Sequence, residues 1–457
     1  MKIRLLLFSL LIATAALAQV PGEERALGWF RAFNSGDAQQ MEAFVHENYT
    51  AEAQQRMTSD ARKERFEQLR ATHGKLRPVN VLASPDGLQI EAESDKGERL
   101  SFRFTIEPTS HLIVGVGIQI GGPANGEDRG PKLAPLSIAR DATREQVAKT
   151  VDAYVRDLAS RDEFSGSVLV AKNGDVLFEN AYGLASRRYN VPNKITTRFN
   201  VGSITKDFTR LAIAQLAQAG KLKVDAPVIT YLPDYPNKEW AQKATVDQLV
   251  KHTSGLGDVF TKRFWDTNTM RFRTPKDFID FFAGDPLQFE PGKGQRYSNY
   301  GYVVLGAIIE AVSGENYYDY IQKHVFDAVP MRASGFLEYR KPNPDVALGH
   351  TRDDNSKQWL ETRSQFERGI PAGSSFATAR DLMLFDRAMR AGKLVNDAGT
   401  RWYYGGSQDG EDIAAGGSPG CNAGVASGGA WTVVVLANID PPIAENLAEH
   451  VYKALTR

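Results

Sequence analysis

The chain has 457 residues, of which 42% are hydrophobic and 24% charged, a composition typical of a soluble globular protein. At about 150 residues per domain, this length predicts two or three domains. Its 55 basic and 55 acidic residues cancel, so the chain lacks the basic excess of nucleic-acid-binding proteins. The single cysteine, Cys421, excludes an internal disulfide and a cysteine-rich zinc site. Without an HExxH, CxxC or Walker pattern, we expect no metal and no cofactor.

The first residues have the pattern of a secretory signal. Lys2 and Arg4 precede an apolar run over 5–12, and Ala16 and Ala18 form a small-x-small cleavage site. The run is too short to cross roughly 30 Å of hydrocarbon, and no second run of that length follows. We therefore predict a signal peptide over residues 1–18, cleavage near Ala18, export to the periplasm or the medium, and no membrane span afterwards.

Residues 19–121 predict a small α+β domain. Apolar residues recur at helical spacing over 22–76, and apolar and polar residues alternate as in strands over 79–120. The order of helices before antiparallel strands, with the phrase Ala-Phe-Asn-Ser-Gly-Asp at 32–37, resembles the NTF2-like fold. Residues 122–142 are rich in glycine and proline and predict a linker.

The remaining residues, 143–457, predict one larger domain. Thr143 and Gln146 form a capping-box pattern that starts a helix, and Asn173-Gly174 joins two apolar runs as a hairpin turn does. Another buried-strand pattern covers 431–437, before a final helix from Ala444. Strands near both ends, with helices between them, predict one sheet built from both ends of the domain and a helical insertion.

Two short motifs carry the candidate chemistry. Ser203-Ile-Thr-Lys206 opens an apolar helical pattern, so the hydroxyl and the amine lie on one helix face. A lysine that loses hydration can act as the base for such a serine. Tyr297-Ser298-Asn299 can add a phenol as proton relay and an amide that holds Lys206 or a substrate carbonyl.

Further phrases occur along the chain in a fixed order: Arg198-Phe-Asn-Val-Gly-Ser-Ile-Thr-Lys206, His252-Thr-Ser-Gly-Leu256, Tyr297-Ser-Asn299, Ala372-Gly373 with Thr378-Ala-Arg-Asp-Leu382, and Gly416-Gly-Ser-Pro-Gly420. Together they resemble the serine β-lactamase-related hydrolases, which include class C β-lactamases, D,D-peptidases and esterases. The resemblance covers residues 143–457. It implies an antiparallel sheet flanked by helices, plus a helical subdomain, with the site between them.

The resemblance also implies roles. Ser203 is then the acylated nucleophile, Lys206 its base and Tyr297 the proton shuttle, with Asn299 beside them. The backbone N–H groups of Ser203 and Gly417 would form an oxyanion hole. Gly417 follows Gly416 on the strand that borders the site. The substrate would be a small ester, amide or peptide. The sequence makes no statement about the oligomeric state.

One position departs from the family pattern. Members usually carry Lys-Thr-Gly or His-x-Gly on the strand that borders the site, and here the triplet is Ala414-Ala415-Gly416. A cation at this place supports recognition of a substrate carboxylate, which alanine cannot do. We therefore expect esterase or peptidase-like activity before β-lactamase or D,D-carboxypeptidase activity. A binding or sensor protein that has lost turnover is the alternative.

Several other patterns were weighed against these motifs. Gly416-Gly-Ser418-Pro-Gly420 matches the nucleophile elbow of another hydrolase class, with Asp440 and His450 following in order, but Pro-Gly favours a turn into a strand. Tyr235-Pro-Asn237 and Lys172-Asn-Gly174 are interpreted as turns, and His252 as a structural residue at a helix end. The aromatic residues of 258–289 are either core or the wall of an acyl pocket.

Overall fold

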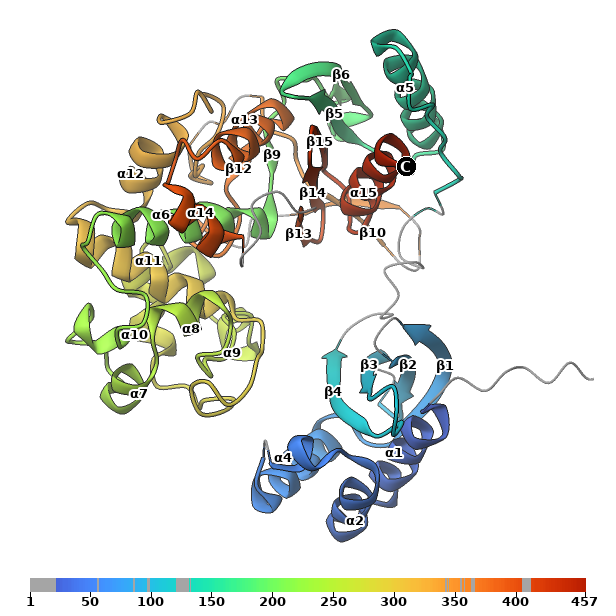
Figure 1. The fold of residues 1–457 in the computed structure, drawn as a ribbon, viewed down its shortest axis with the longest axis vertical. Coiled ribbons are helices and arrows are strands. Elements are labelled where there is room, and N and C mark those ends of the chain that lie inside the picture. Colours follow the sequence, from blue (N-terminus) through green and yellow to red (C-terminus); the bar gives the residue numbers. More distant parts are fainter. Residues whose placement is uncertain are drawn as a thin grey trace, which may run out of the picture. The chain divides into compact units, whose positions relative to one another are not determined.

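The computed structural model describes residues 22–457, except 56, 85–86, 97–98, 121–130, 132, 342, 344, 354–355, 357, 363–365 and 405–411. The predicted signal peptide, 1–18, lies outside the described residues. The chain divides into two compact units between Gly126 and Glu127 (Figure 1).

The first unit is a helical layer on a four-stranded antiparallel sheet. Its elements are α1 (Glu23–Ser35), α2 (Ala38–Asn48), α3 (Ala51–Gln55), α4 (Ser59–His73), β1 (Leu76–Ser84), β2 (Gly87–Ser94), β3 (Arg99–Ile106) and β4 (Ile113–Ile120). Consecutive strands pair in the order β1-β2-β3-β4. Buried rings of α1 pack on those of β3, with the Phe30 and Phe102 centroids 4.8 Å apart. The helices and strands follow the predicted order, and the NTF2-like resemblance stays a prediction.

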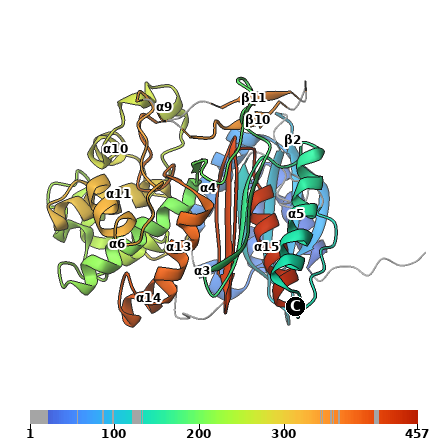
Figure 2. The ribbon, with the colours of Figure 1, turned by 90° about the horizontal axis from the view of Figure 1, so that it is seen from above.

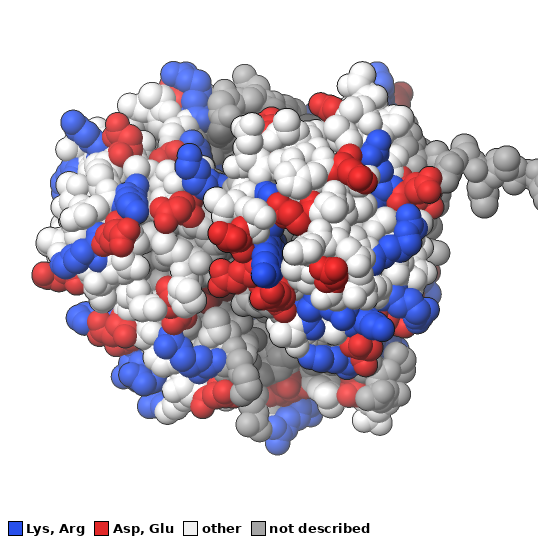
Figure 3. Space-filling view, turned by 90° about the horizontal axis from the view of Figure 1, so that it is seen from below, with Lys and Arg blue, Asp and Glu red and all other residues white. Residues whose placement is uncertain are grey.

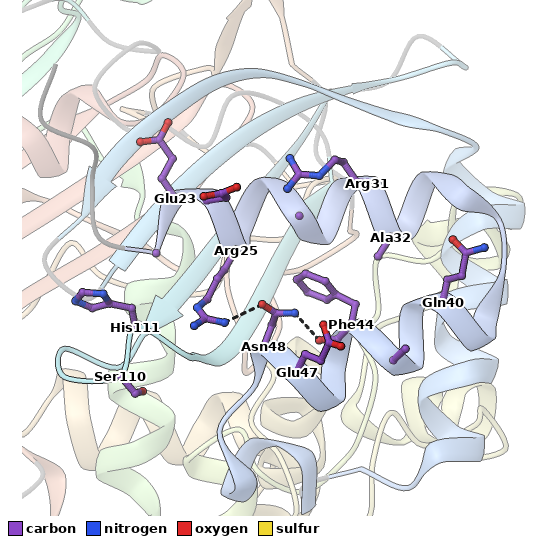
Figure 4. A pocket seen from close by; sticks show the side chains of 14 residues that line it. Glu23, Arg25, Arg31, Ala32, Gln40, Phe44, Glu47, Asn48, Ser110 and His111 are labelled. Carbon is purple, nitrogen blue, oxygen red and sulfur yellow. Dashed lines mark hydrogen bonds between the residues drawn. The ribbon is translucent and has the colours of Figure 1, made fainter. Parts of the chain in front are cut away.

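A hollow of about 960 Å³ opens between α1 and α2 of this unit (Figure 4). Basic and acidic side chains both line it, among them Arg25, Arg31, Glu23 and Glu47. Arg25 donates from Nη1 to Asn48 Oδ1 at 2.9 Å, which links the two helices across the hollow.

The second unit contains a larger sheet with helices on both sides. Its elements begin with α5 (Arg144–Ser160), β5 (Gly166–Lys172), β6 (Asp175–Tyr182), β7 (Leu184–Ser186), β8 (Val191–Pro192), β9 (Phe199–Asn200), η1 (Gly202–Ile204), α6 (Thr205–Gln218), η2 (Val228–Thr230), α7 (Lys238–Lys243), α8 (Val246–Val250), α9 (Lys262–Trp265), η3 (Thr269–Arg271), α10 (Pro275–Phe282) and α11 (Asn299–Ser313). They continue with α12 (Tyr317–Ile321), η4 (Gln322–Phe326), β10 (His350–Arg352), β11 (Trp359–Glu361), β12 (Phe376–Ala377), α13 (Ala379–Arg390), α14 (Asp397–Tyr403), β13 (Asp412–Ser418), β14 (Cys421–Gly428), β15 (Trp431–Ala437) and α15 (Ile443–Thr456).

The central sheet has the order β13-β14-β15-β5-β6, and every neighbouring pair is antiparallel. It therefore combines strands from both ends of the unit, as the sequence predicts. The hairpin β5–β6 turns at Asn173 and Gly174, whose φ values of 51° and 81° fit the expected asparagine-glycine turn. β13 is an edge strand, so one side of its backbone is open to other elements.

Two apolar clusters hold this sheet in the middle of three layers (Figure 2). On one face α5 and α15 pack on side chains such as Val168, Val433 and Val435. On the other face α6, α11 and α13 form a second cluster with Leu169, Val434 and Leu436. Because successive strand residues face opposite sides, both faces of β15 are apolar. The helical layer on the second face carries the candidate site.

The second half of the predicted linker packs on the second unit. Leu133, Leu136 and Ile138 lie against the cluster beneath α5 and α15. The Ala134 carbonyl accepts a hydrogen bond from the Tyr154 hydroxyl at 2.7 Å and lies 2.9 Å from His450 Nε2. The linker predicted over 122–142 therefore includes residues that belong, by packing, to the second unit.

Candidate active site

Ser203 lies in a tight turn between β9 and the buried helix α6. The sequence pattern predicts a helix that opens at Ser203; in the structure η1 is a 3₁₀ turn and the α-helix starts at Thr205. Ser203 and Lys206 are three residues apart across the junction of this turn and α6, so their side chains lie on the same side of the helix start. Lys206 Nζ accordingly lies 3.2 Å from Ser203 Oγ.

Lys206 is buried, with 5% of its surface exposed, and its amine has polar neighbours from three segments. Besides Ser203 Oγ, Nζ donates to Asn299 Oδ1 at 2.7 Å and to the Ala372 carbonyl at 2.5 Å. Burial lowers the pKa of Lys206 to about 7, although the carboxylates of Asp258 and Asp207 oppose this shift. A substantial fraction of the amine is therefore neutral near pH 7 and able to accept a proton.

Tyr297 also contacts the hydroxyl of the same serine. Its ring is 49% exposed, and its hydroxyl lies 2.7 Å from Ser203 Oγ. Loss of hydration raises the pKa of Tyr297 to about 12, while the bond to Ser203 partly opposes this. The phenol thus keeps its proton at neutral pH. Lys206 Nζ also lies 4.7 Å from the centre of the Tyr297 ring.

His252 supports the tyrosine loop instead of titrating in the site. Its imidazole lies between the rings of Tyr297 and Tyr302, with centroids 4.6 and 5.2 Å away. The Ser298 N–H donates to His252 Nδ1 at 3.2 Å. Burial lowers the pKa of His252 to about 4, so the ring is neutral at pH 7. These contacts agree with the structural role predicted from the sequence.

Asn299 is held by a residue that the sequence reasoning missed. Asp258 accepts from Asn299 Nδ2 through both carboxylate oxygens, at 3.1 and 3.0 Å, and this aims Asn299 Oδ1 at Lys206. The only sequence signal is the place of Asp258 two residues after the His252-Thr-Ser-Gly-Leu256 phrase. The Ala372 carbonyl was also missed as a partner of Lys206, although Ala372-Gly373 is among the family phrases.

The edge strand β13 lies directly against the Ser203 turn because glycines line the contact. A Cβ built on Gly416 would lie 2.1 Å from the Val201 carbonyl oxygen and 2.7 Å from the Ser203 nitrogen. A Cβ built on Gly202, whose φ is 53°, would lie 2.7 Å from the Gly417 nitrogen. Any larger side chain would push the strand and the turn apart, so Gly416 and Gly417 are beside Ser203.

Ala414 is half-buried on the same strand and adjoins a small cavity. Carboxylates of Asp207 and Asp412 and the ring of Tyr403 also line that cavity. Asp207 pairs with Arg210 Nη2 at 2.6 Å. Burial raises the pKa values of Asp207 and Asp412, because both carboxyls have lost hydration.

The residues that the sequence analysis set aside lie elsewhere. Ser418 ends β13, and the chain turns there into β14 instead of a helix, so no nucleophile elbow forms. Asp440 accepts from the Gly420 N–H, and His450 contacts Ala134. Tyr235 is buried with its hydroxyl on Tyr300, and Lys172 lies over Trp431.

The aromatic residues after Asp258 divide into two groups. Phe264, Phe272 and Phe282 are buried in the core. Phe260 and Trp265 are 41% and 48% exposed and stack with centroids 5.6 Å apart. These two exposed rings remain available as the predicted pocket wall. The Phe260 N–H donates to Asp258 Oδ1 at 3.3 Å, which connects the pair to the residue that holds Asn299.

Three further features bear on function: clusters of metal-ligating side chains, membrane-spanning helices and surface charge. Among residues 22–457 with the gaps given above, no three or more His, Cys, Asp or Glu side chains gather in a way that could hold a metal ion. In the same described part, no helix combines the length and apolarity needed to cross a bilayer. Basic and acidic side chains are interspersed over the face shown in Figure 3.

A family model described as Beta-lactamase matches residues 147–456, more than half of the chain. The chain therefore belongs to the beta-lactamase family, whose fold carries serine hydrolases. This confirms the resemblance drawn from the motifs and the predicted fold of the second unit.

Curated relatives are similar over a little more than half of the chain. A "Putative penicillin-binding protein PbpX" of Bacillus subtilis is 32% identical over 258 residues, 55% of this chain and 62% of that protein. "Penicillin-binding protein 4*" of the same organism is 30% identical over 264 residues, 55% of this chain and 57% of that protein. The chain thus spans about three fifths of the length of these relatives.

Solved structures support the fold. A penicillin-binding protein from Bacillus halodurans has a TM-score of 0.58 and 29% identity, over 66% of this chain and 98% of that one. A class C beta-lactamase has a TM-score of 0.57 and 19% identity, over 70% and 99%. D-amino acid amidase from Ochrobactrum anthropi SV3 has a TM-score of 0.55 and 20% identity, over 68% and 98%. The latter two show the fold alone.

Proposed function

We propose that this protein is an exported serine hydrolase that forms an acyl-enzyme at Ser203, acting on esters or on amides and peptides. The observation that carries the proposal is the hydrogen-bonded group around Ser203 Oγ. Lys206 Nζ lies 3.2 Å from this oxygen, and the Tyr297 hydroxyl lies 2.7 Å from it. A base and an acid on the same hydroxyl are what acyl transfer requires.

The two pKa shifts support the following proton movements. Neutral Lys206 accepts the Ser203 proton as Oγ attacks the acyl carbon. Tyr297, still protonated, donates its proton to the leaving group, and the Lys206 ammonium returns a proton to the phenolate. Water then attacks the acyl-enzyme, and the same groups act in reverse. Asn299, held by Asp258, keeps Lys206 Nζ beside the serine throughout.

The oxyanion would be stabilised by the backbone N–H groups of Ser203 and Gly417. Their closeness is supported by the contacts that a Cβ on Gly202 or Gly416 would make. Two fixed N–H donors at the developing charge account for a large part of catalysis in such sites. Because Ala414 provides no cation, we propose neutral acyl groups as the preferred substrates, ahead of penicillins and cephalosporins.

Covalent labelling tests this function. The mature protein should react once with a fluorophosphonate and gain the corresponding mass, with peptide mapping to Ser203. Ser203→Ala should abolish both labelling and hydrolysis of short p-nitrophenyl esters, with a nearly unchanged thermal midpoint. Ser418→Ala is the matched control and should react like wild type. Label or activity within tenfold of wild type in Ser203→Ala would contradict the assignment.

A binding or sensor protein on the same fold is the second candidate, favoured by alanine at position 414. Such a protein would acylate at Ser203 without turnover. Pre-steady-state hydrolysis of the p-nitrophenyl ester separates the two candidates. An enzyme gives a burst followed by a continuing steady rate, whereas a sensor gives one equivalent of product and then stops.

A further inference from the structure

A buried asparagine connects the strand beside Ser203 to the last helix. Asn422 in β14 is 0% exposed and lies opposite Gly417 of β13. Its Nδ2 donates to the Gly416 carbonyl at 3.2 Å and to Glu445 Oε2 at 2.6 Å. Its Oδ1 accepts from the Ala444 N–H. One side chain thus ties the Gly416 carbonyl to the first turn of α15.

The direction of that carbonyl determines the direction of the next N–H. In a planar trans peptide, the C=O of one residue and the N–H of the following residue point opposite ways. The Gly416 carbonyl points toward Asn422, so the Gly417 N–H points away from it, across the open edge of β13. The Ser203 turn lies at that edge, close enough that a Cβ on Gly202 would be 2.7 Å from the Gly417 nitrogen.

The strand pairing supports the same direction. Ser418 pairs with Cys421 across the two-residue turn Pro419-Gly420, and pairs alternate between hydrogen-bonded and open in an antiparallel ladder. In a two-residue hairpin the pair that flanks the turn, here Ser418 and Cys421, is hydrogen-bonded. The next pair, Gly417 and Asn422, is therefore open. The polar groups of Gly417 then face the edge. Gly416 and Ala423 then form a bonded pair, so the ladder and the Asn422 amide both hold the Gly416 carbonyl.

We propose that Asn422 is a positioning residue that, through its bond to the Gly416 carbonyl, aims the Gly417 N–H at the oxyanion formed on Ser203. Glu445 and Ala444 hold the asparagine amide in that orientation. Asn422 does not touch the substrate. The inference rests on the proposed function, because the direction of this N–H matters only if an acyl transfer occurs at Ser203.

Asn422→Asp is the main test. The substituted carboxyl has the same size and can still accept from the Ala444 N–H, but its ionised form cannot donate to the Gly416 carbonyl. We expect kcat for a neutral p-nitrophenyl ester to fall roughly 10²-fold, as for loss of an oxyanion donor, with KM changed little. The affinity for a boronic acid that forms a tetrahedral adduct should fall in parallel.

A pH series separates positioning from a general loss of packing. The introduced carboxyl also faces Glu445, whose pKa is raised by burial, so at neutral pH the two acids share one proton and the Gly416 carbonyl lacks a donor. As the pH falls, the pair gains its second proton and again has a donor for the Gly416 carbonyl. The ratio of variant to wild-type kcat should therefore rise toward 1 at acidic pH. Asn438→Asp is the matched control: Asn438 is also buried and well bonded, to the Leu184 and Leu348 carbonyls, and contacts no β13 residue in these bonds. Its kcat per folded molecule should stay at the wild-type level.

Glu445→Ala serves if Asn422→Asp does not fold. It leaves the asparagine in place but removes one of its anchors, and kcat should fall about tenfold with KM unchanged. Folded variants with wild-type kcat and boronic acid affinity would overturn the positioning role alone, provided that wild type is labelled at Ser203. A wild type that is not labelled would overturn the proposed function and this inference together.

Discussion

At the scale of single residues, Lys206 is the group whose state decides reactivity. Its amine is buried, and the Ser203, Asn299 and Ala372 oxygens around it fix its place. Burial without a close carboxylate partner explains why the pKa falls to about 7. The pKa of the neighbouring Tyr297 phenol is raised instead. At neutral pH, Lys206 can therefore accept a proton and Tyr297 can donate one.

The pH dependence of catalysis follows from this pair. The active form has a neutral Lys206, so kcat/KM for an uncharged ester should rise with pH and level off above a midpoint near 7. Lys206→Arg should be inactive throughout, because arginine keeps its proton at these pH values. A pH–rate profile measured about two units on either side of 7 checks this. A flat profile would exclude Lys206 as the base.

Tyr297→Phe removes the proton donor but leaves the ring that packs on His252. Turnover should slow by roughly 10²–10⁴, the usual cost of losing a general acid or base. Tyr235→Phe makes the same change in the other Tyr-x-Asn motif, where the hydroxyl contacts only Tyr300 among the bonds described. Steady-state kinetics of both variants give the comparison. If Tyr297→Phe turned over as fast as Tyr235→Phe, the proton would have to reach the leaving group by another route.

At the scale of elements, the contact between β13 and the Ser203 turn is the feature that makes a site. β13 is an edge strand with an open side, and glycine at 202 and 416 lets the turn approach its backbone. The same strand carries Ala414, whose small side chain leaves an acidic cavity beside Asp207 and Asp412. Strand and turn are more than two hundred residues apart in the chain.

Substitution at Ala414 should change substrate preference. Ala414→Lys adds a cation near the site, and a charge-assisted hydrogen bond to a substrate carboxylate is worth about 1.5–3 kcal/mol. The ratio of kcat/KM for a carboxylated ester to that for its neutral analogue should therefore rise. Pairing of the new ammonium with Asp207 or Asp412 will limit the gain. Ala415→Lys, at the next and exposed position, is the control.

The same measurement on wild type can contradict the reasoning about Ala414. A wild type that already prefers the carboxylated ester would mean that another cation serves the site. Arg380 and Arg401 would then be the first cations to substitute. Arg380 forms an ion pair with Glu179, so its guanidinium is already engaged.

At the scale of the whole molecule, the two units have separate cores, and the boundary falls between Gly126 and Glu127. A truncated chain that begins at Pro131 keeps Leu133, Leu136 and Ile138 and should fold and react with a fluorophosphonate. A chain that begins at Ala139 loses those three partly buried side chains, each worth about 1 kcal/mol. Its thermal midpoint should be several degrees lower than that of the Pro131 chain.

Intact mass after labelling and thermal melts of both truncated chains check this prediction. Equal midpoints would mean that residues 133–138 contribute nothing to the second unit. A Pro131 chain that folds but does not react would show that the first unit takes part in catalysis, and so would make it more than an accessory.

Much of this protein could be predicted from its sequence because the signals are local. Capping boxes, the Asn173-Gly174 turn and alternating apolar residues specify elements from neighbours in the chain. Ser203 and Lys206 are three residues apart, and Tyr297 and Asn299 are two apart, so each motif is visible without the fold. The order of the phrases then indicated the family.

What only the tertiary structure decided depends on segments far apart in sequence. Burial sets the pKa of Lys206 and divides the aromatic residues into core and surface. The hydrogen bonds from Asn299 to Asp258 likewise join residues that are far apart in the chain. The direction of the Gly417 N–H depends on the pairing of β13 with β14 and, in our proposal, on the Asn422 side chain held by the first turn of α15. Hydration and peptide orientation are properties of the packed molecule, so no pattern of neighbouring residues carries them.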